Sequence, residues 1–182
     1  MDTYTYYTDG AATMINQKGK YLREAGGWAF IQLKNSKEAS HQAGGCPLTT
    51  NNEMELYAIY ASMKDFSIIS AAGDELVICS DSSYCIDIFT KWAKNWQKNG
   101  WRRGKNKPIQ NLDIIKTIWN LMAEINDEGC NIVFIKVKGH SHDRLNIKVD
   151  KLAVEAKKIA KRTGKTVGYN GQGDRLLGSK KN

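Results

Sequence analysis

The amino-acid sequence predicts an α/β fold in which a five-stranded mixed sheet is flanked by helices. Strand-like patterns come first, three in succession, and strand-like and helix-like patterns alternate through the rest of the chain. Successive strands with short connections favour an antiparallel meander, whereas alternation implies parallel strands joined by crossover helices. The expected order is βββαβααβα around one core, and the 182 residues suit one domain of this kind.

The first three strands are predicted from β-branched, aromatic and apolar runs near the N-terminus. Residues 3–8, TYTYYT, favour a strand that leads into an Asp-Gly pair. Residues 11–23 are polar and contain glycine, so a turn is expected there. Residues 26–34 and about 38–45 follow as two strands, close enough in sequence to pair as a hairpin.

The central part of the chain alternates between helix and strand patterns. Thr50 and Glu53 form a capping-box pattern, and apolar residues then recur at helical spacing through about Phe66. Residues 75–80, ELVICS, are an apolar run typical of a buried strand. A second helix is expected over residues 82–96, with a serine as its N-cap.

The C-terminal part continues the alternation. After a basic loop, residues 112–126 predict a helix, and residues 131–137, NIVFIKV, predict a nearly continuous buried strand. A loop over residues 138–146 is expected to lead to the last helix, for which Gly164 is the stop. The apolar face of that helix carries Val149, Leu152, Ala153, Ala156 and Ile159.

Composition and charge narrow the class of protein. No apolar run approaches the ~20 residues of a membrane helix, and the N-terminus lacks a secretory pattern, so we expect a soluble cytoplasmic protein. The four cysteines are scattered, which disfavours a zinc site or a disulfide framework. The formal net charge is +8, and the segment from Lys91 to Leu112 holds seven basic residues and no acidic one. This local patch favours a polyanionic partner.

Four acidic residues stand where predicted elements begin or end. Asp9 follows the first strand, Asp81 follows the fourth, and Glu55 lies near the start of the helix between them. Asp150 opens the last helix. Clustered carboxylates repel one another unless cations neutralise them, and oxygen ligands suit Mg²⁺ or Mn²⁺. Spacing alone leaves another interpretation open, in which these acids are turn formers, helix caps or partners of a helix dipole.

Four segments carry a resemblance to a known family. They are YTDGA at 7–11, TTNNEMEL at 49–56, CSDSSY at 79–84 and VKGHSHDRLNIKVDKLA at 137–153. In this order and spacing they resemble the signature segments of the type 1 ribonuclease H family, over roughly residues 3–160. The resemblance implies a ribonuclease H-like fold. It also implies an endonuclease that hydrolyses the RNA strand of RNA/DNA hybrids with low sequence specificity and leaves 5′-phosphate ends.

The resemblance further implies two-metal catalysis. Two Mg²⁺ ions, with Mn²⁺ as the alternative, would be held by the four acids named above, Asp9, Glu55, Asp81 and Asp150. His140 matches the family's mobile-loop histidine, which is thought to assist proton transfer or product release. Imidazole titrates near neutral pH, so the chemistry suits that role, and a surface histidine without a role is the alternative.

Several polar residues match positions that contact the substrate in the family. Thr50, Asn51 and Asn52 resemble contacts to sugar and phosphate oxygens of the hybrid, although capping the first helix is an alternative role. The other candidates beside the carboxylates are Gly10, Ser83 and Asn146. Ser83 stands where a longer amide side chain is common, which leaves one RNA contact in doubt.

Residues 91–108 resemble the basic protrusion of some family members. Its cations would neutralise phosphates, and its tryptophans would pack on sugars or make the protrusion rigid. The candidate residues are Lys91, Trp92, Lys94, Trp96, Lys98, Trp101, Arg102, Arg103, Lys105 and Lys107. Core packing is an equally open role for Trp92 or Trp96, because the two are four residues apart on the predicted helix.

The parts outside the resemblance define the expected domain limits. The family's short turn after the first Asp is replaced by a longer stretch without proline, MINQKGKYLREAGG. A catalytic domain is expected over residues 1–163, followed by a loosely held, basic, glycine-rich tail over residues 164–182. We expect a monomer with no membrane contact. The rival functions are a non-catalytic hybrid-binding module, which the presence of all four acids disfavours, and a related DNA-directed nuclease.

Overall fold

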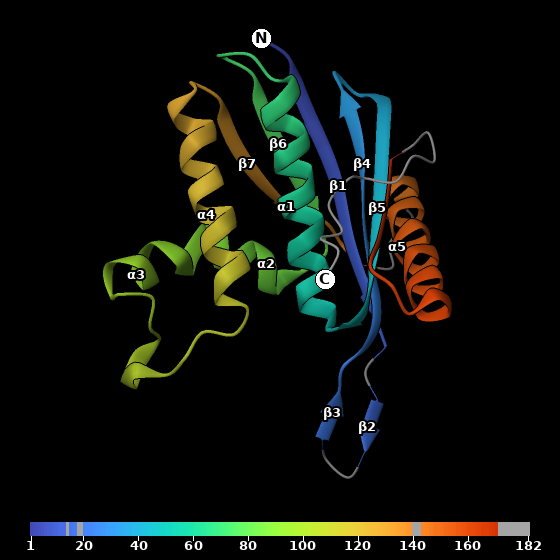
Figure 1. Ribbon diagram of the computed structural model, residues 1–182. Helices are drawn as coiled ribbons and strands as arrows, with labels where there is room; N and C mark the ends of the chain where they lie inside the picture. The colour runs from blue at the N-terminus through green and yellow to red at the C-terminus, as the bar shows by residue number, and fades with distance from the viewer. Residues whose placement is uncertain (14, 18–19, 140–142, 171–182) are drawn as a thin grey trace.

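The main sheet is mixed and has six strands. The computed structural model describes residues 1–13, 15–17, 20–139 and 143–170 (Figure 1). The strand order is β7-β6-β1-β4-β5-β8. The strands are β1 (Thr3–Ala12), β4 (Glu24–Lys34), β5 (Lys37–Thr49), β6 (Glu75–Ser80), β7 (Asn131–Lys136) and β8 (Val167–Asn170). The predicted α/β class and mixed sheet are confirmed, and the predicted number of five strands is wrong.

The pairing combines the expected meander with parallel strands. β1 pairs antiparallel with β4, and β4 pairs antiparallel with β5. β1 pairs parallel with β6, with Thr8 opposite Ser80, and β6 pairs parallel with β7, with Ser80 opposite Lys136. The ends of β6 and β7 therefore lie level with Thr8 of β1, and β1 continues beyond them to Ala12.

The sixth strand comes from the segment that was predicted to be a loosely held tail. β8 pairs antiparallel with β5, with Gly44 opposite Gly168. The prediction is wrong for residues 167–170 because the composition of this segment shows only a short, glycine-containing stretch. The free backbone groups of β5 at the sheet edge favour pairing, and this is a tertiary effect that local sequence does not reveal.

The predicted turn over residues 11–23 is also wrong. β1 continues to Ala12, and a small hairpin follows, formed by β2 (Ile15–Gln17) and β3 (Lys20–Leu22). Figure 1 shows this hairpin projecting beyond the end of the main sheet. The sequence of these short strands lacks apolar alternation, so the periodicity signal for strands is absent.

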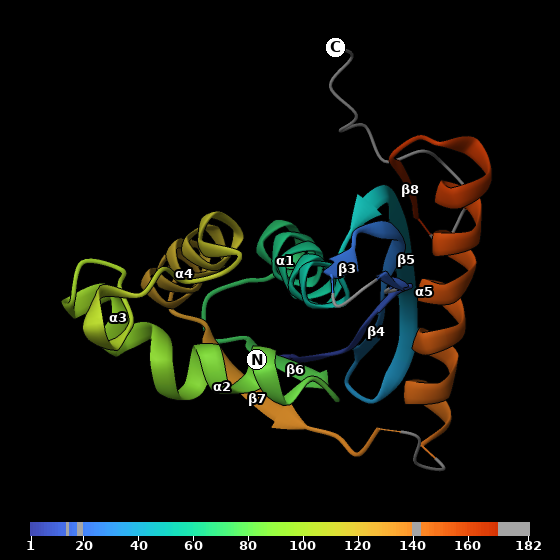
Figure 2. The ribbon, with the colours of Figure 1, turned by 90° about the horizontal axis from the view of Figure 1, so that it is seen from below.

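The helices cover both faces of the sheet. α1 (Asn51–Ile69) and α4 (Leu112–Asp127) lie on one face, and α5 (Arg144–Thr163) lies on the other (Figure 2). α5 begins at Arg144 with Asp143 as its N-cap, so the predicted loop ends earlier and Asp150 lies in the second turn rather than at the helix start. Within the described residues, every helix is too short or too polar to cross a membrane.

The predicted helix over residues 82–96 is interrupted. Ser82 is its N-cap as expected, and its hydroxyl accepts a hydrogen bond from the backbone of Cys85. The chain then forms α2 (Ser83–Asp87), a π-helical segment (Ile88–Trp92) and α3 (Ala93–Lys98). A short 3₁₀ turn (Gly104–Asn106) follows in the basic loop. The wider π-helical turn shifts the side-chain phase between α2 and α3.

Two apolar clusters fill the space on either side of the sheet. Tyr6 and Phe30 are fully buried and pack edge to face toward α1, with ring centroids 5.3 Å apart. On the other face, Ile31 packs with Val149 and neighbouring residues of α5. Gly27 is required for this approach, because a Cβ atom there would lie 2.1 Å from the carbonyl oxygen of Ala153. The sheet therefore holds α1 and α5 at fixed positions relative to β1.

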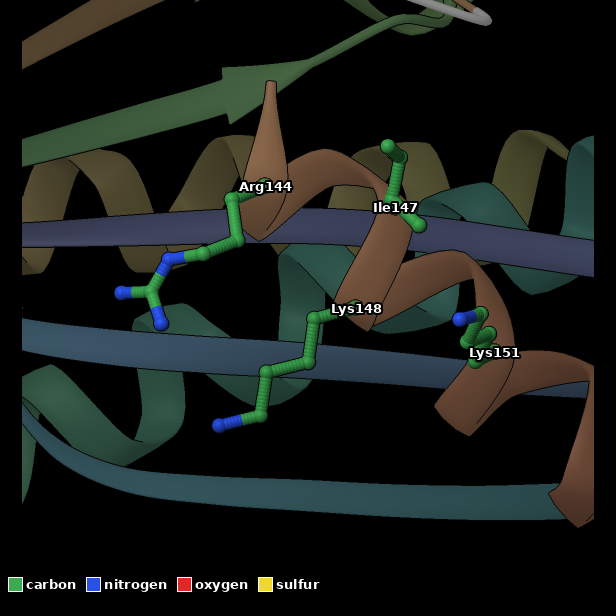
Figure 3. A pocket seen from close by; sticks show the side chains of 4 residues that line it. All are labelled: Arg144, Ile147, Lys148 and Lys151. Carbon is green, nitrogen blue, oxygen red and sulfur yellow. The ribbon is translucent and has the colours of Figure 1, made fainter. Parts of the chain in front are cut away.

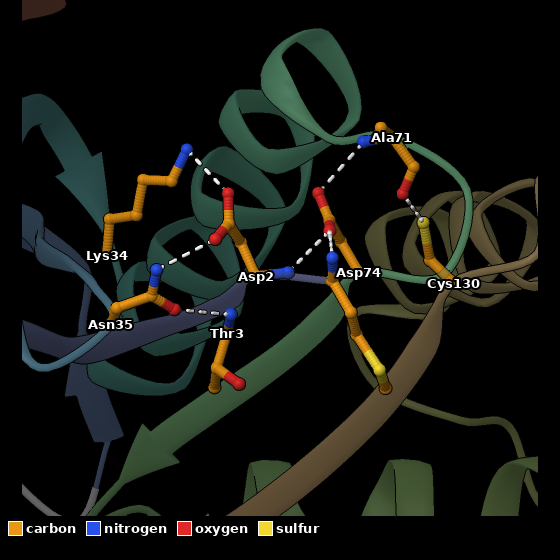
Figure 4. Close-up of polar contacts among 8 residues, drawn as sticks. Asp2, Thr3, Lys34, Asn35, Ala71, Asp74 and Cys130 are labelled. Atoms are coloured by element: carbon orange, nitrogen blue, oxygen red, sulfur yellow. Dashed lines mark hydrogen bonds and ion pairs between the residues drawn. The ribbon is translucent and has the colours of Figure 1, made fainter.

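The N-terminus is tied to the sheet by two buried or half-buried aspartates (Figure 4). Asp74 accepts hydrogen bonds from the backbone of Asp2 at 2.7 Å and of Ala71 at 3.0 Å. The carboxylate of Asp2 binds the ammonium of Lys34 at 2.7 Å and the amide of Asn35 at 2.8 Å. These contacts fix the start of β1, the strand that carries Asp9.

Candidate active site

The four predicted carboxylates come from four different elements at one edge of the sheet. Asp9 lies on β1, and Asp81 directly follows the last residue of β6. Glu55 is in the first turns of α1, and Asp150 is in the second turn of α5. Thr8 of β1 pairs with Ser80 of β6 in parallel register, so the next residues, Asp9 and Asp81, lie at the same level. Asp9 therefore lies within β1 and does not end the strand as predicted.

Asp9 is buried, and the charges of the other three acids affect its pKa. Its residue is 8% exposed, and its carboxylate accepts a hydrogen bond from the backbone of Gly10 at 2.7 Å. Burial and the negative charges of Asp81, Asp150 and Glu55 raise the pKa of Asp9 to about 7, although the Gly10 bond opposes the rise. The charges of the other three acids therefore act on Asp9.

Glu55 is held by neighbours on two elements. One carboxylate oxygen accepts a hydrogen bond from the side-chain amide of Asn51 at 2.8 Å, and the other accepts one from the hydroxyl of Ser82. Burial raises the pKa of Glu55, and Asp81 adds to the rise, whereas the Ser82 bond and the charge of Lys136 lower it. Glu55 thus links the start of α1 to the start of α2.

Gly10 allows this part of the site to form. A Cβ atom on Gly10 would lie 2.2 Å from the backbone nitrogen of Glu55, which no side chain can tolerate without movement. The end of β1 therefore packs directly on the first turns of α1. The structure gives Gly10 this steric role, and its predicted contact with substrate stays a prediction.

The side chains at this site offer carboxylate and amide oxygens, the ligand types that a hard divalent cation prefers. Within the described residues, acidic, cysteine and histidine side chains form no group of three or more at metal-ligand spacing. The charges of the other three acids nevertheless act on Asp9, and such Coulomb effects reach over longer distances than direct ligation. Asn146 is 4% exposed and lies one helical turn from Asp150, and its side-chain oxygen has no hydrogen-bond partner among the residues that the structure describes. Clustered acids and an unpaired buried oxygen are both stabilised by a bound cation or its water.

Two further sequence predictions lie near Asp81. His140 is outside the described residues, so its role stays a prediction. Gly139 is described, and a Cβ atom there would lie 3.0 Å from a carboxylate oxygen of Asp81. The chain leading to His140 therefore passes beside this acid.

Lys136 is a site residue that the sequence analysis missed. Its ammonium donates hydrogen bonds to the carbonyl oxygen of Asp81 and, at 3.3 Å, to that of Val137. The only sequence signal is a lysine ending the otherwise apolar run of β7. The contact depends on the register that places Lys136 beside Ser80, and the sequence does not provide that register.

The residues at the start of α1 that were predicted to contact substrate also make hydrogen bonds within the protein. Thr50 and Glu53 form the expected capping box. The side-chain oxygen of Asn51 accepts a hydrogen bond from the backbone of Ala12 at 3.0 Å. Asn52 is half-buried in the same turn, and Ser83 is exposed at the start of α2. The predicted capping role is confirmed for Thr50, and the substrate contacts of these residues stay predictions.

The basic protrusion stands on the side of the molecule away from α5 (Figures 1 and 2). The rings of Trp92 and Trp96 lie 5.7 Å apart, and Trp96 and Trp101 pack against the core. The ammonium of Lys116 lies 5.6 Å from the centre of the Trp101 ring. These tryptophans therefore stiffen the protrusion. Its exposed cations are Lys91, Lys94, Lys98, Arg102, Arg103, Lys105 and Lys107, of which Lys91 pairs with Asp87 at 2.6 Å.

A second basic surface lies on α5. Arg144, Ile147, Lys148 and Lys151 line a depression of about 420 Å³ on the solvent side of the helix (Figure 3). Lys148 also pairs with Glu38. The sequence analysis did not single out this group, because it appears only when helical spacing is combined with the start of α5 at Arg144.

Comparisons with known proteins agree with this arrangement. The RNase H family model matches residues 1–158. Ribonuclease H of Treponema denticola is 36% identical over 162 residues, which cover 82% of this chain and 94% of the relative. LC9-RNase H1, described as a type 1 RNase H with the type 2 active-site motif, has a TM-score of 0.67 at 21% identity, covering 91% of this chain and 76% of that one.

The structure of LC11-RNase H1 in complex with an RNA/DNA hybrid has a similar fold. Its TM-score is 0.61 at 19% identity, and the match covers 86% of this chain and 98% of that one. At these identities the structural matches support the fold, whereas the family model covers the carboxylate segments in sequence. The chain therefore belongs to the RNase H family.

Proposed function

We propose that this protein is an endonuclease that hydrolyses the RNA strand of RNA/DNA hybrids by two-metal-ion catalysis. The observation that carries the proposal is the buried Asp9, whose carboxylate is electrostatically coupled to Glu55, Asp81 and Asp150. Family membership adds support, since relatives that cover most of the chain are ribonucleases H. The complex of LC11-RNase H1 with an RNA/DNA hybrid supports the choice of substrate.

The four acids would hold two Mg²⁺ ions, for which Mn²⁺ is the alternative. When bound, such ions supply activation of a water nucleophile and stabilisation of the leaving 3′ oxygen, so that products carry 5′-phosphate ends. The side chain of Asn51 and the hydroxyl of Ser82 hold Glu55 in place. His140 would exchange the proton of the attacking water or of the leaving group, because imidazole titrates near neutral pH.

Substrate recognition would depend on backbone shape and charge. The exposed cations of the protrusion are suited to phosphates of the hybrid, and Trp96 and Trp101 anchor this segment to the core. Asn52 and Ser83 flank the acids and could reach the 2′-hydroxyl that distinguishes RNA from DNA. Such contacts read no base edges, so sequence specificity should be low.

A single assay tests the proposal. Labelled RNA/DNA hybrid, double-stranded DNA and double-stranded RNA are each incubated with the protein in Mg²⁺ or in chelator. We expect cleavage of the RNA strand of the hybrid only, dependent on Mg²⁺, and its loss in Asp9→Asn with retained hybrid binding. Binding without cleavage would instead establish the non-catalytic module, and cleavage of DNA would establish the DNA-directed nuclease.

A further inference from the structure

The solvent-facing side of α5 carries a row of charged residues, most of them cations. The opposite side of the helix is buried against the sheet through Val149, Ala153, Ala156 and Ala160. On the outer side a charged residue recurs every three or four positions, the spacing that keeps side chains on one face of a helix. These residues are Arg144, Lys148, Lys151, Glu155, Lys158 and Arg162. We call the five cations of this row the α5 stripe.

The stripe has a surplus of positive charge. Lys148 pairs with Glu38 of β5, and Lys158 pairs with Glu155 at 3.6 Å. Five cations therefore face two acids. The cations that form no ion pair with an acid in the described part of the chain are Arg144, Lys151 and Arg162. These three charges are available to a partner without the loss of an existing ion pair.

The cations are closest together at the start of α5. The side chains of Arg144 and Lys148 extend from the helix in the same direction (Figure 3). Together with Ile147 and Lys151 they line the depression of about 420 Å³. Guanidinium and ammonium groups around a shallow surface are suited to bind phosphate oxygens through charge-assisted hydrogen bonds.

The chemistry of this face favours a nucleic acid over a lipid surface or a protein. A helix that binds a lipid surface needs an apolar face beside its cations, and the core of a protein interface is depleted in charge. Ile147, which is 40% exposed, is the one large apolar side chain that α5 exposes. The stripe extends over about 27 Å of the helix axis. Along such a length a nucleic acid strand presents one phosphate charge per ~3.4 Å, so a row of cations meets a row of anions.

The stripe is separate from the basic protrusion. α5 covers the face of the sheet opposite α1 and α4, and the protrusion lies on the side of the molecule away from α5 (Figure 2). Because the buried side of α5 packs on the sheet, the stripe points outward on its own side of the molecule. The two cationic surfaces therefore face different surroundings.

We propose that the α5 stripe is a second nucleic-acid-binding surface, which holds the phosphate backbone of a segment other than the one at the protrusion. The proposal goes beyond the proposed function, because it requires neither a metal ion nor cleavage. Two separate surfaces on one chain raise the affinity for long nucleic acids, since binding at one surface raises the effective concentration of phosphates at the other.

The test measures binding of a long, fluorescently labelled DNA duplex to the full chain in chelator, by anisotropy at several salt concentrations. The stripe variant combines Arg144→Gln, Lys151→Gln and Arg162→Gln. Its matched control combines Arg144→Lys, Lys151→Arg and Arg162→Lys, which keeps every charge. A cation in the last turn of a helix stabilises it, so a second variant with only Arg144→Gln and Lys151→Gln is measured as well. Thermal melting establishes that each variant folds.

The slope of log affinity against log salt should fall by about 0.9 for each phosphate that is no longer neutralised, and thus by about 1–3 in the stripe variant. The charge-keeping control should match wild type. The same decrease should occur when the protrusion cations Arg102, Arg103, Lys105 and Lys107 are already neutralised, because separate surfaces contribute additively.

An unchanged salt slope in both stripe variants would overturn the proposal. A decrease that disappears once the protrusion is neutralised would show a single shared surface and would overturn it too. Vesicles of phosphatidylserine and phosphatidylcholine form a further arm, in which loss of vesicle binding with unchanged DNA binding would assign the stripe to a lipid surface. Failure of the wild type to cleave a hybrid would overturn the proposed function alone, because all these measurements are made in chelator.

Discussion

Burial gives Asp9 a protonation behaviour that differs from that of an ordinary aspartate. Its pKa is raised to about 7 in the folded protein, against 3.8 for the ordinary side chain. Between these values the folded state binds more protons than the unfolded state, so stability falls as pH rises. Below about pH 4 both states are protonated, and this dependence on pH disappears.

Asp9→Asn should therefore stabilise the metal-free protein at alkaline pH. We expect a gain of about 1–3 kcal/mol at pH 8 that vanishes near pH 4, since one pKa unit corresponds to ~1.4 kcal/mol. Urea denaturation in chelator across this pH range measures the gain. Asp113→Asn, at an exposed acid in α4, is the control and should show no such trend. A pH-independent difference between Asp9→Asn and wild type would contradict the coupled cluster.

Ser82 performs two tasks with one hydroxyl. It accepts a hydrogen bond from Cys85 to cap α2 and donates one to Glu55. Ser82→Ala should lower the free energy of unfolding by about 1–3 kcal/mol, because the helix cap and a bond to a charged group are both removed. Denaturant unfolding measures the change. Ser83→Ala, at the exposed neighbouring serine, should change stability little, and an equal decrease in the two variants would contradict the capping role.

Among the elements, the packing of β1 on α1 sets the geometry of the site. Gly10→Ala would place a methyl group 2.2 Å from the backbone nitrogen of Glu55, so strand or helix must move. We expect a decrease in stability of about 1–3 kcal/mol, with cleavage reduced further because Glu55 is displaced. Gly104→Ala is the control, since a Cβ atom there meets nothing within 4 Å. Thermal melting and initial cleavage rates of the two variants measure the predicted losses of stability and activity.

Some strands and helices could be predicted from the sequence, and others could not. Strands and helices with a buried face, such as β6 and α4, follow from their apolar spacing. β8 and the β2–β3 hairpin were missed because backbone pairing forms them without an apolar pattern. The π-helical interruption over Ile88–Trp92 was missed because its apolar residues fit an ordinary helix equally well.

The candidate active site was also predictable only in part. The four acids follow from motifs in sequence, and the electrostatic coupling of Asp9 to its companions agrees with their convergence. Lys136 and the dual role of Ser82 were not predictable, because they depend on register and on the direction of side chains between elements. The catalytic roles, the two ions, monomeric action and a cytoplasmic location stay predictions.

At the level of the whole molecule, cations are gathered on a protrusion that the tryptophans hold rigid. Neutralising Arg102, Arg103, Lys105 and Lys107 together should weaken hybrid binding and flatten its dependence on salt. The slope of log affinity against log salt should fall by roughly 0.7–0.9 for each phosphate that the variant no longer neutralises. Fluorescence anisotropy with labelled hybrid at several salt concentrations measures this slope.

The matched control for the protrusion removes positive charge from other parts of the surface. Lys37→Gln combined with Lys64→Gln neutralises two exposed lysines outside the protrusion and should leave the slope unchanged. If the slope stayed constant in the protrusion variant as well, binding of phosphates by these cations would be excluded.

The pairing of β8 with β5 has a consequence for self-association. Without β8, the backbone donors and acceptors of β5 from Gln42 to Gly45 would face solvent as an open template. A second copy could then add its own strand there, and chains would join edge to edge. The segment after α5 thus covers the backbone of β5 over these residues, so its removal should favour edge-to-edge association.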